Sequence, residues 1–160
     1  MATEPASAEG VFVGACTMEW HVSFSPSVGL VPGSGVHTFS GGGDCIVNGE
    51  SATLTLSGGT LHADPRTGFG CLAGVAFGNV QFILDVEGFP NPNVQLGVVN
   101  SGGVLTVVAF ALLTQFEGVG ELVQEPATTS TCATGGTASH TTWTGAMAFQ
   151  DPDPPPVRRS

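Results

Sequence analysis

The stretch Gly103-Val-Leu-Thr-Val-Val-Ala-Phe-Ala-Leu-Leu-Thr-Gln-Phe116 is the most apolar segment of the chain. Its β-branched residues disfavour a helix, and it is shorter than the ~20 apolar residues that a membrane-spanning helix needs. It therefore predicts a β-strand. Both alternating faces carry large side chains, such as Leu105 and Val107 on one face and Val108 and Phe110 on the other. We expect a central strand that is covered on both sides.

Most other apolar stretches alternate with polar residues, which is typical of half-buried antiparallel strands. Asn48-Gly49 is a two-residue turn signal, and Gly78-Asn79 is interpreted as the turn of a hairpin between 71–77 and 80–86. No amphipathic helix pattern appears, and 125–139 is expected to be a long loop rich in Thr, Ser, Ala and Gly. The sequence predicts an all-β fold of roughly eight to ten short strands without significant helix. Its architecture is an antiparallel β-barrel or a two-sheet β-sandwich.

The length of 160 residues fits a single domain with a sizeable core. We place this domain at residues 10–150. Residues 1–9 are small and polar and predict a flexible N-terminal arm. Residues 151–160 form a Pro-rich C-terminal tail that cannot continue a sheet.

Four cysteines, Cys16, Cys45, Cys71 and Cys132, give an even count without a C-x-x-C pair. This spacing favours disulfides over a zinc site. Among the three possible pairings we favour Cys16 with Cys45 and Cys71 with Cys132. In an antiparallel pair the numbers of opposing residues have a constant sum. Pairing Trp20 with Phe39 gives a sum of 59 and pairing Cys16 with Cys45 gives 61, and a bulge at 41–43 would absorb this difference of two.

Disulfides imply an oxidising compartment. The chain begins at Met1 without a basic or apolar leader, so no signal peptide is present. We expect a mature secreted chain whose leader has been removed and whose Met1 was added for expression. If Met1 is native, this inference fails, and free thiols become an alternative to the disulfides.

The formal charge of −10 arises from 13 acidic residues against three arginines, and lysine is absent. Nucleic acid and anionic membrane surfaces require clustered basic residues, so neither is an expected partner. The acidity is interpreted as a source of solubility.

No motif specifies a reaction. Gly68-Phe-Gly-Cys-Leu-Ala73 matches G-x-G-x-x-A but leads into a strand, so it lacks the helix N-terminus that binds a pyrophosphate. Glu19 with His21, and His62 with Asp64, are interpreted as surface and turn residues, and His37 as a core or edge histidine. The remaining candidates have the same structural reading: His140, Asp85, Glu87, Glu117 and Glu121. We predict no catalytic residue, no metal site and no cofactor, and therefore a protein that is not an enzyme.

The segment Cys16-Thr-Met-Glu-Trp-His-Val-Ser-Phe-Ser-Pro-Ser-Val-Gly-Leu30 resembles a family of small secreted proteins of actinobacteria, in which a cysteine begins a strand that ends in a Ser-Pro-Gly-Leu-like turn. Gly70-Cys71, Gly118-Val-Gly120 and Cys132-Ala-Thr-Gly-Gly136 are similar too, so the resemblance covers residues 11–150. Ser27-Val28 departs from the expected Pro-Gly step. The resemblance implies an extracellular, disulfide-bonded β-domain without assigned activity, and it carries over no catalytic residue.

These observations favour a secreted domain that works by binding a protein partner through exposed strand edges or loop ends. One specific version is an adaptor or structural subunit of an extracellular assembly, such as a secreted toxin particle. In it an arm spanning residues 2–14 adds a strand to another subunit, with Val11, Phe12 and Val13 as apolar anchors. The alternative is a β-barrel that binds a small apolar ligand, and a hydrolase is the least supported reading. The sequence does not identify the partner or the oligomeric state.

Overall fold

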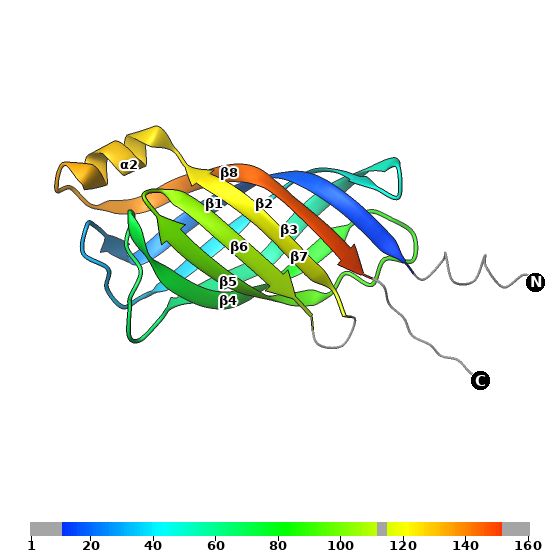
Figure 1. Cartoon of the computed structure of the whole chain (residues 1–160), viewed down its shortest axis with the longest axis horizontal. Helices are drawn as coiled ribbons and strands as arrows, with labels where there is room; N and C mark the ends of the chain where they lie inside the picture. Colours follow the sequence, from blue (N-terminus) through cyan, green and yellow to red (C-terminus); the bar gives the residue numbers. More distant parts are fainter. Residues whose placement is uncertain (1–10, 112–114, 152–160) are drawn as a thin grey trace, which may run out of the picture.

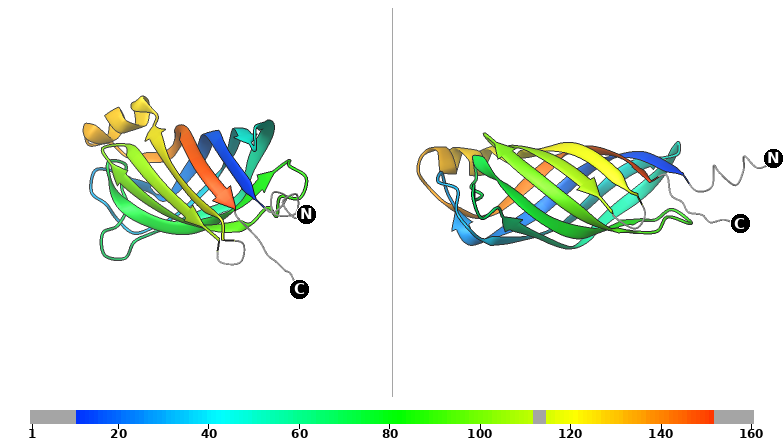
Figure 2. Two further views of the ribbon diagram at one scale, coloured as in Figure 1. Left: turned by 45° about the vertical axis from the view of Figure 1, so that its right-hand side comes forward. Right: turned by 60° about the horizontal axis from the view of Figure 1, so that its bottom comes forward.

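The structure is a computed structural model that describes residues 11–111 and 115–151. Within them eight strands form a closed antiparallel barrel in which each strand pairs with the next, and β1 with β8 (Figures 1 and 2). The strands are β1 (Phe12–Val28), β2 (Val36–Val47), β3 (Glu50–Ala63), β4 (Ala73–Leu84), β5 (Asn93–Ser101), β6 (Val104–Phe110), β7 (Glu117–Gln124) and β8 (Ala138–Asp151). The predicted all-β fold is confirmed, and the barrel is the correct one of the two architectures.

Closure changes one expectation about partners. β1 pairs with β8 from Phe12–Asp151 to Val28–Ala138, so the described strands leave no free edge. A closed barrel satisfies all of its backbone ladder groups internally. The described strands therefore offer no edge for the predicted strand-edge contact, and the predicted protein partner stays a prediction.

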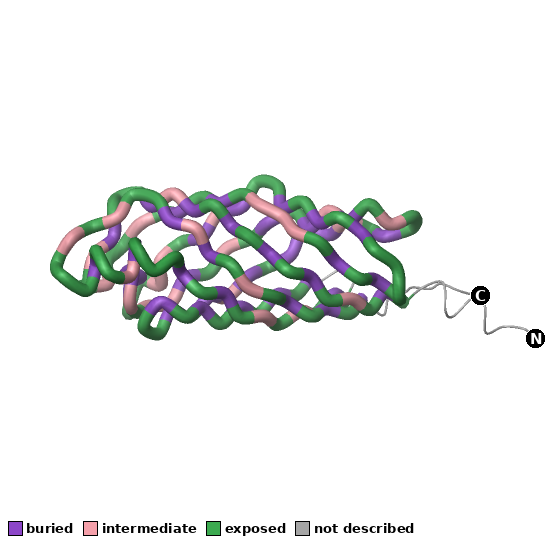
Figure 3. The backbone as a smooth tube through the Cα atoms, turned by 90° about the horizontal axis from the view of Figure 1, so that it is seen from above, coloured by how far each residue is buried: buried purple, intermediate pink, exposed green. Residues whose placement is uncertain are grey.

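Buried and exposed residues alternate along most of each strand, as expected for a wall with one inner and one outer face (Figure 3). At the end near the chain termini, ring contacts join Phe12, Phe82, Phe89, Phe116 and Phe149. Toward the other end, a second group of contacting rings contains Trp20, Phe24, His37, Phe39, Phe69 and Trp143. Neighbouring ring centroids lie 4.4 to 6.5 Å apart, so side chains pack closely in both halves.

The apolar 103–116 stretch is not a strand covered on both faces. β6 ends at Phe110, and Phe116 precedes β7. Leu105 and Val107 are buried, whereas Val108 and Phe110 remain 49% and 45% exposed. The expectation of a doubly covered central strand is wrong because a barrel strand has one inner and one outer face, and nothing in the described chain covers this outer face.

The predicted hairpin turn at Gly78-Asn79 is also absent, because β4 runs without interruption through both residues. A Cβ atom on Gly78 would lie 1.7 Å from the carbonyl oxygen of Thr60 on β3. This glycine therefore serves a close approach of two strands and not a turn. By contrast, Asn48 (φ 50°) and Gly49 (φ 86°) do form the predicted turn, between β2 and β3.

Both predicted disulfides are present. Cys16 and Cys45 are directly opposite in the β1–β2 ladder, with Cα atoms 4.0 Å apart. This ladder keeps one register throughout, so Trp20 faces Gly41 and not Phe39 as expected. The Trp20 and Phe39 rings nevertheless stack, with centroids 4.4 Å apart, and the Phe39 ring lies in the space that Gly59 leaves. The register shift occurs between β2 and β3, at Phe39/Gly41.

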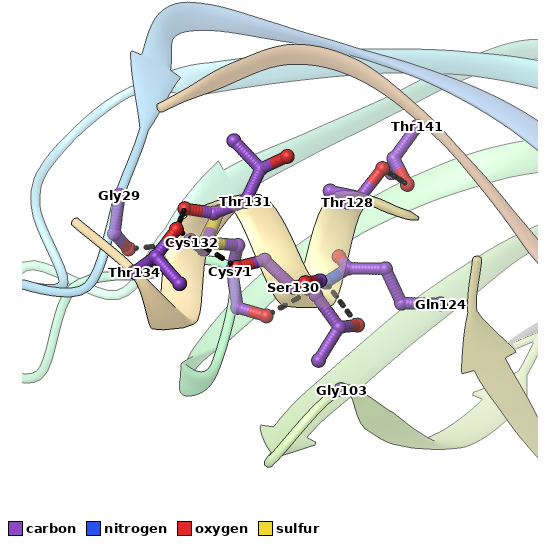
Figure 4. The surroundings of a disulfide bond; sticks show 12 residues. Gly29, Cys71, Gly103, Gln124, Thr128, Ser130, Thr131, Cys132, Thr134 and Thr141 are labelled. Atoms are coloured by element: carbon purple, nitrogen blue, oxygen red, sulfur yellow. Dashed lines mark hydrogen bonds between the residues drawn. A yellow bond between two sulfur atoms is a disulfide. The ribbon is translucent and has the colours of Figure 1, made fainter. Parts of the chain in front are cut away.

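The expected 125–139 loop contains a helix, α2 (Pro126–Ala133), at the end of the barrel opposite the chain termini. Cys132 of α2 is bonded to Cys71 in the β3–β4 loop (Figure 4). The Nε2 of buried Gln124 donates to the Cys71 carbonyl at 2.9 Å, and its Oε1 accepts from the Trp143 indole at 3.2 Å. Thr141 donates to Thr128 of the helix at 2.9 Å. The disulfide, the Thr141–Thr128 contact and a 3.1 Å hydrogen bond from Gln124 to Thr129 Oγ1 attach α2 to the barrel. None of these contacts requires an apolar stripe, so no amphipathic pattern predicted the helix.

Candidate functional site

The most unusual feature of the outer wall is a group of exposed apolar side chains on β4 to β7, where polar residues are expected. We call it the apolar face, and it consists of Phe77, Val99, Val108, Phe110 and Val119. Phe77 and Val119 are 52% and 56% exposed. Single exposed apolar residues are common, but contiguous apolar patches mark contact sites.

The strand registers make this face continuous. Phe77 is opposite Gly97, Gly97 is opposite Val108, and Val108 is opposite Val119. A Cβ atom on Gly97 would lie 3.3 Å from Val108 and 3.8 Å from Phe77, so these two side chains flank the bare glycine. Four adjacent strands, at about 4.8 Å per strand, thus carry one apolar row without a polar interruption.

The same row continues from Val119 to Ala148 on β8 and Ala15 on β1. Here the outward side chains become small, and the wall is hollowed into a groove of about 560 Å³. Val13, Val119, Glu117 and Gln150 are among its lining residues. From inside the barrel the Phe149 ring packs against Gly14, where a Cβ atom would lie 2.6 Å from it. We call this hollow the β1–β7–β8 groove.

Charge is distributed unevenly around the barrel. The outward positions of β4, β5 and β6 carry no charged residue. On β7, Glu117 and Glu121 lie on either side of Val119 along the strand. The apolar face is therefore uncharged over three strands and is bordered by carboxylates where it meets the groove.

The structure places the predicted partner-binding residues in the barrel wall. Asn48 holds this segment: its Oδ1 accepts from the Val13 N–H at 2.9 Å, and its Nδ2 donates to the Val11 carbonyl at 3.0 Å. Val11 and Val13 are exposed, and Val13 lines the groove. Phe12 is buried, with its ring 5.3 Å from that of Phe89, so it is unavailable as an anchor in the closed barrel. Residues 12–14 are paired with β8 in the closed barrel, so an arm that donates them to another subunit would first have to leave this ladder.

The predicted flexible arm at 1–9 lies outside the described residues, as does nearly all of the predicted tail at 151–160. Asp151 is the exception. It belongs to β8, where it is buried and paired in register with Phe12. The sheet therefore extends one residue further than predicted.

His37 is a core histidine. It is fully buried among Phe24 and Phe69, and neither ring nitrogen makes a hydrogen bond of good geometry. Burial lowers its pKa, nearby His62 lowers it further, and an interaction with the Val36 backbone acts in the opposite direction. The buried Trp20 indole nitrogen also lacks a hydrogen-bond partner.

The other histidine and carboxylate candidates are surface or turn residues. Asp64 accepts hydrogen bonds from the backbone and hydroxyl of Thr67 at 3.1 and 2.8 Å, which lower the pKa of its carboxyl group. Asp85 accepts from the Thr53 N–H at 2.6 Å, and Ser139 lies 3.0 Å from His140 Nδ1. These contacts stabilise turns and strand ends.

Glu19 and His21 line a smaller groove of about 410 Å³ on β1 and β2, together with Gly41, Gly42 and Gly43. Their side chains are well exposed and 4.0 Å apart. Among residues 11–111 and 115–151, no three His, Cys, Asp or Glu side chains are placed to hold a metal ion. Nor does any helix in this part of the chain have the length and apolarity to cross a membrane.

Comparison with protein-family models, with curated proteins and with solved structures gave no match. The candidate site therefore rests on the geometry of this chain. The sequence predicts that Val108 and Phe110 belong to a strand covered on both faces, so it does not identify them as a contact surface. The missed signal was the run Val104, Thr106, Val108, Phe110, whose parity is opposite to that of the buried Leu105 and Val107.

Proposed function

We propose that this protein is a secreted, non-enzymatic domain that binds another protein through the apolar face and the adjoining β1–β7–β8 groove. The observation that carries the proposal is the exposure of Phe77, Val108 and Val119 in one continuous row. Full burial of a Val or Phe side chain contributes about 1.5 to 3 kcal/mol. A partner that covers this row gains several such contributions to the binding free energy without burying a charged side chain of β4, β5 or β6.

The packed interior supports this reading over the apolar-ligand alternative. Inward-facing rings contact one another in both halves of the barrel. Small eight-stranded barrels are often filled by their own side chains. Ligand binding inside would require several of these rings to move, whereas the outer face is accessible as it stands.

The two disulfides are consistent with an extracellular protein. A rigid barrel with an apolar outer face suits an adaptor or structural subunit of an extracellular assembly. Because the barrel leaves no free edge in the described strands, we place the contact on side chains of the wall and not on a donated strand.

The test is capture of partners from the culture supernatant of the producing cells, with native mass spectrometry of the captured material. Val108→Glu puts a charge in the middle of the apolar face. Thr55→Glu is the matched control, since Thr55 is an exposed outward residue of β3, away from this face. We expect wild type and T55E to capture the same protein and V108E to lose it. Equal capture by all three would contradict the proposal, as would a co-purified small molecule without a protein.

A further inference from the structure

The floor of the β1–β7–β8 groove is apolar and made of small residues. Ala148 lies between Val119 and Ala15 in the outer row, and the backbones of Gly14 and Gly118 complete the floor. Val119 and Val13 lie among the larger lining side chains. An occupant that fits here presents apolar side chains toward Ala148.

One carboxylate, that of Glu117, lies beside the apolar floor of the groove. In the next row of the wall Glu117 is opposite Phe110 on one side and Gln150 on the other, and Gln150 is opposite Val13. The Glu117 side chain lines the groove and has no ion pair or hydrogen bond with a described residue. It can therefore accept a charge-assisted hydrogen bond from an occupant.

Among the described residues, the Asp, Glu, Lys and Arg side chains at this end of the barrel are all acidic. Glu50 begins β3, and Asp85 and Glu87 follow β4. The β2–β3 and β4–β5 connections lie at the end of the barrel where the described chain begins and ends (Figure 1). Arg66, the only Arg or Lys of the described residues, lies in the β3–β4 connection, which the Cys71–Cys132 disulfide joins to α2 at the opposite end. The field of these carboxylates attracts cations and raises their association rate. A second copy of this chain would instead bring further carboxylates against Glu117 and Glu121.

From this charge complementarity we propose that the groove binds an extended segment of the partner protein that combines apolar side chains with Lys or Arg. The apolar side chains cover Ala148 and contact Val119, and the cation pairs with Glu117. This inference rests on the proposed function and specifies the chemistry of its partner.

The test uses the full-length protein and three fluorescein-labelled peptides of equal length, followed by fluorescence anisotropy. One peptide alternates valine and lysine, one alternates valine and glutamate, and one alternates serine and lysine. Ala148→Phe fills the groove from an exposed position, with Ala148→Ser as its control. Glu117→Gln removes the carboxylate charge, with Glu50→Gln as a control at the same end of the barrel. Val119→Ser tests the wall independently if A148F folds poorly.

We expect the valine–lysine peptide to bind at least tenfold more tightly than either other peptide. A148F and V119S should weaken it by tenfold and about threefold, while A148S has little effect. E117Q should weaken it about two- to fivefold, the range of an exposed ion pair, and E50Q by less. The E117Q effect should shrink as salt is raised.

Three results would overturn the inference: serine–lysine binding as tight as valine–lysine binding, equal loss in E117Q and E50Q, or no valine–lysine binding at all. A dimer that A148F converts into a monomer would also overturn it, in favour of a second copy. The proposed function fails separately, when V108E leaves partner capture unchanged. Equal binding of the valine–lysine and valine–glutamate peptides, with loss of both in A148F, would refute only the cation.

Discussion

Removal of the Cys71–Cys132 disulfide should destabilise the barrel more than removal of Cys16–Cys45, because it closes a longer segment of chain. The sequence separations are 61 and 29 residues. In the chain-entropy model these loops contribute about 4.3 and about 3.6 kcal/mol. The double variants C71A/C132A and C16A/C45A should lose stability by these amounts, which are a large part of the ~5 to 15 kcal/mol of an ordinary domain.

The assay is urea unfolding of wild type and both double variants under non-reducing conditions. With a slope of roughly 2.5 kcal/mol per molar urea, the C71A/C132A midpoint should fall by about 1.7 M. Hydrogen exchange adds a local readout. α2 has only eight residues, too few for a stable isolated helix, so its amides should exchange faster in C71A/C132A than in C16A/C45A.

Two results would refute this reasoning. A loss below about 1.5 kcal/mol in C71A/C132A would show that Gln124 and the Thr128–Thr141 contact hold α2 without the disulfide. A larger loss in C16A/C45A would show that packing inside the β1–β2 ladder outweighs loop length.

Three further predictions concern single positions. Burial lowers the pKa of His37 below its unfolded value near 6.5. The stability that neutral His37 contributes is therefore full above that pH and is lost as pH falls toward the folded pKa. Urea unfolding at pH 7.5 and 5 should show less pH dependence in His37→Phe than in wild type. Gly78→Ala should lower the unfolding free energy by about 3 kcal/mol or more, because the new Cβ would lie 1.7 Å from a backbone oxygen. Gly97→Ala should lower it by less than ~1 kcal/mol, because its Cβ would meet only a side chain, at 3.3 Å. Equal urea midpoints for the two variants would contradict this. Phe77→Thr should change stability by less than ~0.5 kcal/mol but shorten retention on a hydrophobic-interaction column, and unchanged retention would mean that the apolar face is not accessible.

Much of the fold could be predicted because its cause is local. Strict alternation along residues 16–24 separates an inner face from an outer one before any partner strand is known. Asn48-Gly49 predicted its turn because both residues accept positive φ. The pairing of Cys16 with Cys45 followed from the adjacency of the strands on either side of a short connection.

The sequence does not distinguish a glycine that forms a turn from one that allows two strands to approach closely. The Gly78-Asn79 and Asn48-Gly49 pairs look equivalent in sequence, yet Gly78 lies within β4 because the Thr60 backbone approaches it. α2 could not be predicted either. Its residues lack an apolar stripe, and the helix depends on a disulfide to the distant Cys71 and on side-chain contacts with Gln124 and Thr141, which flank it.

The sequence by itself determined an antiparallel β domain with two disulfides and an acidic, lysine-free surface. Only the tertiary structure decided that the sheet closes into a barrel and that Val108 and Phe110 of the apolar 103–116 stretch face outward. Alternation divides residues into two sets, but it cannot say which set is buried when both are apolar. Closure decides this physically, because the inner set, with Leu105 and Val107, packs inside the barrel and the outer set remains on the wall.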